Sequence, residues 1–231
     1  MLKYSLPLLL IFLVTVACAY ITYDKGAWRF NYPDYKDYPI HGLDISHHQG
    51  QIDWPSVDNQ KYKFVFIKAT EGGDFKDRLF EKNWENAGRS GFLVGAYHFF
   101  TLCRDGRTQA LNFIESVPSG QNSMPPVVDL EFVGNCSKRP SKQEFLQELS
   151  NYVALIEETY NQKTIIYTTY EFFEDYLAGS SYETYPLWIR DIFKKPSSHF
   201  LNWGIWQYAD NAKVNGINGR VDLNVMDVIL Y

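Results

Sequence analysis

Short apolar segments recur along residues 40–225, and over most of that span amphipathic helical stripes separate them. Each segment has the length and the content of branched and aromatic residues that are typical of buried strands. Eight segments qualify, at residues 40–45, 63–69, 93–99, 124–132, 163–168, 187–191, 203–208 and 220–225. Apolar residues at helical spacing predict helices over 79–87, 108–117, 141–156 and 170–177, and the Ser-x-x-Glu pattern from Ser141 to Glu144 predicts a capping box at the start of the third helix. This alternation of strand and helix restricts the chain to an α/β fold.

The last three predicted strands differ from the others because no helical stripe lies between them. Their connections carry turn signals instead, among them Pro196, Asn-Gly at 215–216 and Asn-Gly at 218–219. About a dozen residues without a helix are barely enough for a parallel crossover, so we expect some of these strands to be antiparallel. Five βα units and three further strands predict a modified TIM-like (β/α)5β3 barrel, a single domain over residues 40–231. A three-layer open sheet is the alternative architecture.

The composition of the 231-residue chain allows one substantial core and argues against a nucleic-acid surface. Hydrophobic residues make up 45% of the chain, and aromatic residues make up 17%. Aromatic rings fill cores, and they also form platforms for flat or ring-shaped ligands. The net charge is -5 and basic residues form no dense stripe, so we expect no nucleic-acid partner.

The N-terminus has the features of an export signal. Lys3 precedes a long apolar run, and no charge interrupts residues 4–23. Ala-Cys-Ala at 17–19 has the small-x-small pattern of a cleavage site, which indicates a signal peptide over residues 1–19. The uncharged span is also long enough to cross a bilayer, so an uncleaved membrane anchor is the alternative. Residues 20–39 are rich in aromatics and lack helical or strand periodicity, which predicts a linker before the barrel.

Export, whether secreted, periplasmic or membrane-anchored, would place Cys103 and Cys136 where a disulfide can persist. Both cysteines follow predicted strands, so the loops that carry them can be neighbours. We therefore expect a bridge between them, with two free thiols as the alternative.

The segment at 124–132 ends in two carboxylates, Asp129 and Glu131. Strand side chains alternate between faces, so both acids project to the same side with Cα atoms roughly 6–7 Å apart. Two acids together at the end of a buried strand are costly unless they have a function. The alternative is a strand end that enters solvent, where both acids are hydrated.

Polar residues recur at the ends of the other predicted strands, where an α/β barrel gathers its functional groups. Taken singly, each has a structural explanation, such as capping a helix or packing in the rim. Together they predict an acidic cleft with aromatic walls, which suits a neutral polyol better than an anion. Paired acids in such a cleft indicate glycoside hydrolysis, in which one carboxyl protonates the leaving oxygen. The candidate site residues are Asp44, Glu71, Tyr97, Asp129, Glu131, Tyr167, Trp188, Asp191, Gln207 and Asp222.

The segment GLDISHHQG at residues 42–50 resembles the opening of glycoside hydrolase family 25, the Chalaropsis-type lysozymes. The resemblance covers roughly residues 40–227 in order. It implies a (β/α)5β3 barrel and cleavage of the β-1,4 bond between N-acetylmuramic acid and N-acetylglucosamine, with peptidoglycan glycan strands as the partner. The matching segments continue with FVFIKATEG at 64–72, GAYHF at 95–99, PVVDLE at 126–131, IYT at 166–168, LWI at 187–189, WQY at 206–208 and VDLN at 221–224.

The same resemblance implies separate roles for the acids. Glu131 is expected to be the general acid. Asp129 is expected to orient the substrate's 2-acetamido group or to stabilise the charge that develops at the anomeric carbon. Asp44 matches a further catalytic carboxylate, and Asp222 matches a carboxylate of the substrate groove. Substrate binding is also expected at Tyr97, Tyr167, Trp188, Glu71 and Gln207.

One segment departs from the family pattern. After LWI at 187–189, many relatives have a small residue and then an aromatic, whereas this chain has Arg190 and Asp191. The sugar contacts that the family makes at this position are therefore not assigned to Arg190 and Asp191. We expect Asp191 to form a local ion pair with Arg190.

Three histidines, His47, His48 and His98, lie near strand ends and raise the question of a metal site. Their spacing matches no known zinc pattern, and adjacent strand residues point to opposite faces. We expect neither a metal nor a cofactor, and we expect His98 to pack between the barrel and its helices.

Two other functions are compatible with parts of the sequence. A chitin-type or other N-acetylhexosaminidase also uses Asp-x-Glu, although the longer Asp-x-x-Asp-x-Asp-x-Glu spacing is absent here. A peptidoglycan-binding module without turnover is the second alternative. The presence of both Asp129 and Glu131 argues against it.

Overall fold

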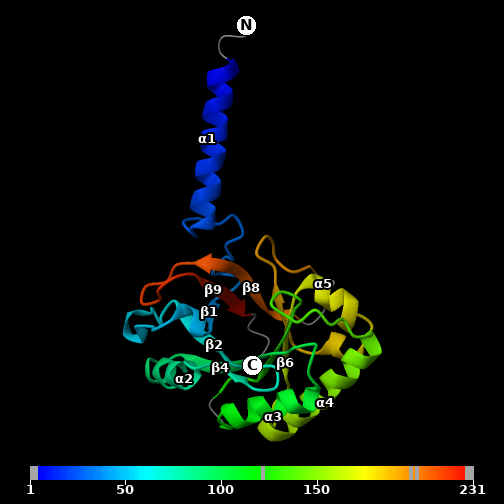
Figure 1. Cartoon of the computed structure of the whole chain (residues 1–231). Helices are drawn as coiled ribbons and strands as arrows, with labels where there is room; N and C mark the ends of the chain where they lie inside the picture. Colours follow the sequence, from blue (N-terminus) through cyan, green and yellow to red (C-terminus); the bar gives the residue numbers. More distant parts are fainter. Residues whose placement is uncertain (1–4, 121–122, 198–199, 201–202, 227–231) are drawn as a thin grey trace.

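Strands and helices alternate around a closed barrel, from which one long helix projects (Figure 1). The structure is a computed structural model that describes residues 5–120, 123–197, 200 and 203–226. The strands are β1 (Ile40–Ile45), β2 (Tyr62–Glu71), β3 (Phe75–Lys76), β4 (Leu93–Phe99), β5 (Val127–Leu130), β6 (Ile165–Thr168), β7 (Leu187–Arg190), β8 (Trp203–Ala212) and β9 (Val221–Met226). The helices are α1 (Ser5–Asp24), α2 (Phe80–Arg89), α3 (Gly106–Ser116), α4 (Lys142–Tyr160) and α5 (Tyr170–Phe172), with short turns η1 (His47–Gln49), η2 (Trp54–Ser56), η3 (Phe173–Leu177) and η4 (Ser181–Thr184).

The sheet closes on itself, which excludes the open three-layer alternative. Its order is β1-β9-β8-β7-β6-β5-β4-β2, and β1 pairs with β2 to complete the ring. The short β3 adds only an antiparallel hairpin to the end of β2. All other neighbours are parallel except those of β9, which runs antiparallel to both β8 and β1. The predicted (β/α)5β3 barrel is confirmed, and so is the expectation of antiparallel pairing in its last third.

Large side chains fill the barrel interior below its carboxyl end. Gly42 and Gly95 make room for them: a Cβ on Gly42 would lie 2.4 Å from the ring of Phe64, and a Cβ on Gly95 would lie 2.3 Å from that of Phe66. The barrel is therefore a packed core, and only side chains at the carboxyl end can reach a ligand. The interior cluster consists of Phe64, Phe66, Met124, Val127, Ile165, Tyr167, Trp188, Ile205 and Met226.

Helices cover only part of the barrel wall. The capping box predicted at Ser141 is present: its hydroxyl accepts from the Glu144 amide, and the Glu144 carboxylate accepts from the Ser141 amide. It begins α4, which packs against α3 outside the parallel strands (Figure 1). Around β8, β9 and β1 the N-terminal segment takes the place of helices. There Asn31 donates to the carbonyls of Ile192 and Tyr208, and Tyr38 is buried at 6% exposure.

The N-terminal helix continues further than expected. Residues 20–24 were expected to belong to a linker, but they form the last turn of α1. The physical reason is that the apolar, uncharged run reaches Tyr23, and after Pro7 in the first turn no glycine or proline interrupts it until Gly26. By length and composition Pro7–Asp24 could cross a membrane, with a mean hydropathy of 1.8 and none of its residues buried in protein.

Candidate active site

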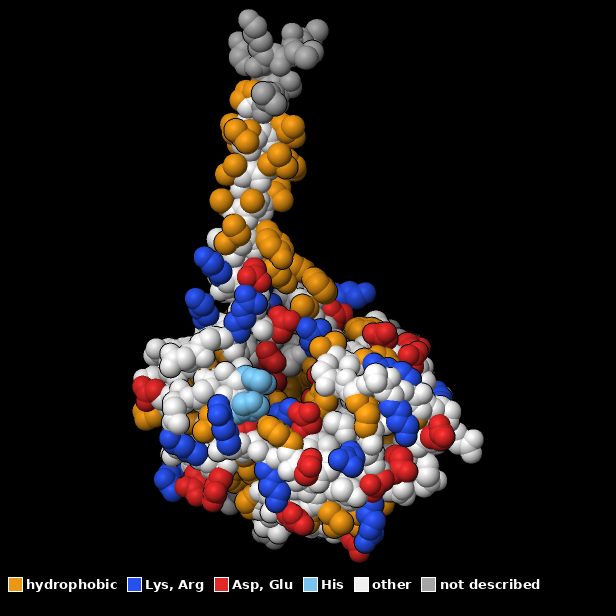
Figure 2. Space-filling view, in the orientation of Figure 1, with side chains coloured by type: hydrophobic (Ala, Val, Ile, Leu, Met, Phe, Trp, Pro, Cys, Tyr) orange, Lys and Arg blue, Asp and Glu red, His pale blue; other side chains and the backbone are white. Residues whose placement is uncertain are grey.

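A cavity of about 80 Å³ lies at the carboxyl end of the barrel strands. Figure 2 shows a hollow on this face with acidic side chains in it. The structure brings together eight of the residues singled out from the sequence: Asp44, Tyr97, Asp129, Glu131, Tyr167, Trp188, Gln207 and Asp222. Glu71 and Asp191 are outside this lining.

Strand alternation explains why residues so far apart in sequence converge here. On β5, Val127 points into the packed interior, and Asp129, two residues later, lies above it at the cavity. Ile165 and Tyr167 repeat this arrangement on β6. Because β9 runs the other way, its contribution, Asp222, comes from near its start and pairs in register with Asp44.

Asp129 and Glu131 share the cavity but have different surroundings. Asp129 is buried, and its Oδ1 has no hydrogen-bond partner among the described residues. Burial, followed by the charge of Glu131, raises the pKa of Asp129 well above its ordinary value. Glu131 follows the end of β5 and is partly exposed. Burial and the charge of Asp44 raise its pKa to about 7, so it holds its proton close to neutrality.

A chain of hydrogen bonds fixes the orientation of Asp44. Its Oδ2 accepts from Gln207 Nε2 at 3.0 Å and from Asn224 Nδ2 at 2.7 Å. The Tyr167 hydroxyl donates to Gln207 Oε1 at 3.0 Å, and Trp188 Nε1 donates to Asn224 Oδ1 at 2.9 Å. Each amide is thus held from both ends, which orients its N–H group toward Asp44.

Asp222 completes a second acidic pair. It lies beside Asp44, and Gln207 Nε2 reaches its Oδ2 at 3.3 Å. Burial, followed by the charge of Asp44, raises the pKa of Asp222 well above its ordinary value. Burial raises the pKa of Asp44 too, although the hydrogen bonds from Asn224 and Gln207 oppose this effect. The pair therefore favours a shared proton over two negative charges.

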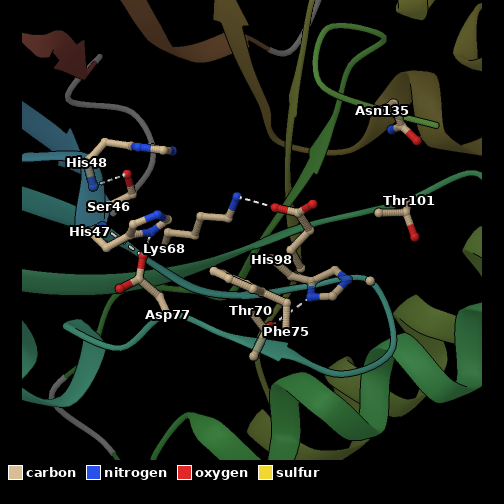
Figure 3. A network of polar contacts seen from close by, with 12 residues as sticks. Ser46, His47, His48, Lys68, Thr70, Phe75, Asp77, His98, Thr101 and Asn135 are labelled. Carbon is tan, nitrogen blue, oxygen red and sulfur yellow. Dashed lines mark hydrogen bonds and ion pairs between the residues drawn. The ribbon is translucent and has the colours of Figure 1, made fainter.

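Two cations beside the acids were not predicted as site residues. Lys68, on β2, pairs with Glu71 at 2.6 Å between Nζ and Oε2 (Figure 3). Arg190 pairs with Asp210 at 2.8 Å. The charges of Arg190 and Lys68 both lower the pKa of Glu131 and so oppose the effect of burial.

The expected ion pair between Arg190 and Asp191 is wrong. Arg190 is the last residue of β7, whereas Asp191 begins the loop and its Oδ1 accepts from the amides of Phe193 and Lys194. Successive residues at a strand end point to opposite sides, so Arg190 meets a residue of the neighbouring β8 instead.

The sequence did contain a signal for the missed residues. Asn224 lies two positions after Asp222, and Lys68 lies two positions after the interior residue Phe66. The same alternation that groups Asp129 with Glu131 therefore places these side chains on the inner face.

The histidines take separate structural roles. His98 is buried, and its Nδ1 lies 2.7 Å from the Thr70 hydroxyl (Figure 3). Its ring stacks on Tyr152 of α4. The expectation that it packs between barrel and helices is confirmed. His47 Nδ1 lies 2.9 Å from Asp77 Oδ2. Within the described part of the chain, no three His, Cys, Asp or Glu side chains are grouped to hold a metal.

A disulfide joins two loops at this end of the barrel. Cys103 follows β4 and Cys136 follows β5, and their Cα atoms are 6.3 Å apart. The bridge therefore links the loop after β5, the strand that carries Asp129, to the loop after β4.

Comparison with known proteins identifies the family. The model of glycosyl hydrolases family 25 matches residues 43–217. YegX, an uncharacterized protein of Escherichia coli strain K12, is 36% identical over 196 residues, which are 82% of this chain and 70% of the relative. Lysozyme M1 of Streptomyces globisporus is 30% identical over 200 residues, which are 80% of this chain and 67% of the relative.

A solved structure agrees with these matches. A family 25 glycosyl hydrolase from Bacillus anthracis is 38% identical and has a TM-score of 0.79, over 86% of this chain and 94% of that one. The chain therefore belongs to glycoside hydrolase family 25, and it is a glycoside hydrolase.

Proposed function

We propose that this hydrolase is an exported muramidase that cleaves the β-1,4 bond between N-acetylmuramic acid and N-acetylglucosamine in peptidoglycan. Similarity to Lysozyme M1 supports the substrate class. A second hollow of about 430 Å³ is lined by Phe132, which follows Glu131 in the chain, and by Arg190, whose charge acts on Glu131. An extended glycan strand could therefore lie across both hollows.

The observation that carries the proposal is the environment of Glu131. A general acid must hold its proton at the working pH and release it in the transition state, so its best pKa lies near that pH. Burial and the charge of Asp44 raise the pKa of Glu131 to about 7, and its position at the cavity opening leaves it accessible. An exposed glutamate would be ionised under the same conditions.

We assign Asp129 to the substrate's acetamido group. Its buried, unpartnered Oδ1 can accept a hydrogen bond from the acetamido N–H. That bond favours the ionised form of Asp129 and polarises the amide, which makes the acetamido oxygen a better nucleophile. Substrate-assisted attack is an established exception to the scheme with two enzyme carboxylates.

The chemistry then takes two steps. The acetamido oxygen attacks the anomeric carbon while the glycosidic bond breaks, and Glu131 gives its proton to the leaving oxygen. Water next attacks the anomeric carbon from the opposite side, the bond to the acetamido oxygen breaks, and the Glu131 carboxylate takes the water's proton. Two inversions give net retention of configuration.

Replacement of the acid tests the proposal directly. Glu131→Gln should lower the rate on purified peptidoglycan by about 10²–10⁴-fold, because the leaving group then departs without a proton. Mass spectrometry of the products should find new muramic-acid reducing ends with the wild type only. Glu85→Gln, in an exposed ion pair of α2, is the matched control and should retain full activity.

The outcomes separate the alternatives. New N-acetylglucosamine reducing ends would indicate a hexosaminidase, and binding without any new ends across pH 4–8 would indicate a binding module. Equal activity of the wild type and Glu131→Gln would remove Glu131 from the role of acid. A glycosyl ester trapped on Asp129 would show that the enzyme carboxylate, and not the acetamido group, is the nucleophile.

A further inference from the structure

The first observation concerns the length and character of α1. Its 20 residues give a helix about 30 Å long, which matches the hydrocarbon thickness of a bilayer. The apolar core of a cleaved signal is shorter, about 7–15 residues. The hydroxyls of Thr15 and Thr22 donate to helix carbonyls four residues earlier, so neither needs water. The helix is therefore suited to remain in the membrane.

The barrel holds the end of this helix. Asn211 Nδ2 donates to the carbonyls of Tyr23 and Asp24, at 3.1 and 3.2 Å. Carbonyls at a helix end lack partners within the helix, so Asn211 caps them together with the Gly26 amide, which donates to Tyr23 O at 2.9 Å. Arg220 also pairs with the Asp24 carboxylate at 2.8 Å.

These contacts lie at the active-site end of the barrel. Asn211 is near the end of β8, four residues beyond Gln207 of the cavity, and Arg220 is two residues before Asp222 of the cavity. Figure 1 shows α1 leaving the domain beside β8 and β9. The helix thus attaches beside the cavity and not at the opposite end of the barrel.

The segment after α1 is bound to the barrel along its length. Asn31 donates to Ile192 O at 2.8 Å and Tyr208 O at 2.9 Å, and the ring of Tyr35 stacks on His41. If residues 25–39 were a flexible linker, the barrel could move over roughly 20 Å relative to the end of α1. Docking removes that freedom and fixes the barrel relative to the helix.

Four aromatic rings gather where the helix ends, and three of them are exposed. Tyr23 contacts Trp28 and Phe30, and Phe30 stacks on Phe193 with ring centroids 6.5 Å apart. Phe193 is 62% exposed, Phe30 59% and Trp28 44%. Figure 2 shows hydrophobic side chains continuing from the helix onto the domain. Aromatic residues at the end of a spanning helix are typical of the membrane interface.

We propose that α1 is retained as a membrane anchor, and that the aromatic cluster of Tyr23, Trp28, Phe30 and Phe193 rests in the lipid headgroup region. Phe193 follows Arg190 and Asp191 in a loop that lines the hollow beside Glu131. The catalytic opening is therefore held at the membrane surface, facing glycan strands that lie against the bilayer. The inference that the enzyme acts on glycan strands near the bilayer rests on the proposed function. The placement of the aromatic cluster in the lipid headgroup region does not.

A depth measurement tests the seating without relying on catalysis. In a Cys18→Ser background, Phe193→Cys and Leu93→Cys each receive a spin label, and the full chain is placed in phosphatidylethanolamine–phosphatidylglycerol vesicles. Cys18 is the free thiol, and Cys103 and Cys136 are bridged. Leu93, an exposed apolar residue at the start of β4, is the matched control at the opposite end of the barrel.

We expect the label at 193 to be several-fold less accessible to a water-soluble nickel chelate, and more accessible to oxygen, than the label at 93. Equal accessibility at both sites would overturn the seating. Protection from nickel without a gain in oxygen accessibility would indicate a protein partner or a second copy, and it would overturn the lipid assignment.

Mass spectrometry of the membrane fraction should find α1 intact, and a chain that begins at Tyr20 would contradict a retained anchor.

Two glycines provide a matched pair for the docking contact. Gly26 has φ +70 and Gly179 has φ +71, so alanine carries similar backbone strain at both. A Cβ on Gly26 would lie 2.3 Å from the Asn211 carbonyl oxygen, whereas a Cβ on Gly179 meets nothing within 4 Å. Gly26→Ala should return the label at 193 to high nickel accessibility, and Gly179→Ala should not. Indistinguishable variants would overturn the role of the docked segment. Hydrolysis of soluble glycan fragments, measured in parallel, shows whether catalysis itself survives.

Discussion

At the scale of single residues, Glu131 links burial to pH dependence. Its pKa of about 7 means that the protonated fraction falls as the pH rises through neutrality. The pH profile of kcat/KM should therefore have a basic limb near pH 7. A basic limb near the ordinary glutamate pKa would contradict the proposed environment.

Arg190 should set the position of that limb. Its charge lowers the pKa of Glu131, so Arg190→Gln should move the basic limb of kcat/KM to higher pH, by about half a unit or more. Arg89→Gln removes an exposed guanidinium from α2 and serves as the control with an unchanged limb. An unmoved limb in Arg190→Gln would show that its charge does not reach the acid.

The same carboxyl should reduce stability at high pH. Glu131 has a folded-state pKa of about 7, above its ordinary value of 4.5, so between these pH values the folded state keeps a proton that the unfolded state has lost. The stabilisation linked to that proton is complete below about pH 4.5 and is lost as the pH rises through 7.

The free energy of unfolding of Glu131→Gln should therefore exceed that of the wild type by about 1–3 kcal/mol at pH 8. At pH 4 the two proteins should have nearly the same free energy of unfolding. Urea denaturation at the two pH values measures this difference. An equal gain at both pH values would point to packing and not to ionisation.

At the scale of elements, the close approach of α3 and α4 depends on one glycine. A Cβ on Gly106 would lie 1.8 Å from the Glu148 carbonyl oxygen. Gly106→Ala should force the helices apart and cost about 1–3 kcal/mol of unfolding free energy. Gly88→Ala in α2 meets nothing within 4 Å and should be neutral or slightly stabilising. Thermal unfolding of both variants checks the contrast.

Element prediction succeeded where a local pattern is strong. The bounds of β1 and β4 equal the predicted ones, and the capping box at Ser141 located the start of α4. The predicted bounds were less accurate where pairing with a neighbouring strand extends an element. β8 continues to Ala212, beyond the predicted end at 208, because it keeps pairing with β9 across two irregularities in register.

At the scale of the whole molecule, residues 25–39 act as part of the barrel wall. Tyr38 is 6% exposed and packs beside Trp203 and Trp206. A chain that begins at Ile40 lacks the buried Tyr38 ring, so its free energy of unfolding should be lower by at least about 2 kcal/mol. Its Tm should fall by roughly 4–8 °C, whereas a chain that begins at Tyr20 should melt like the full chain. Equal melting of both truncated chains would show that the segment adds nothing to the fold.

The sequence by itself determined the α/β barrel, the family and most of the cavity lining, because strand alternation and the motif segments are local properties of the chain. Tertiary structure decided the rest. Arg190 pairs with Asp210 of β8 and not with Asp191, since the partner of a charged group at a strand end depends on which neighbouring strand lies beside it. The burial that raises the pKa of Glu131, and the docking of the N-terminal segment onto β8, depend on contacts between residues far apart in sequence. No local pattern encodes such contacts.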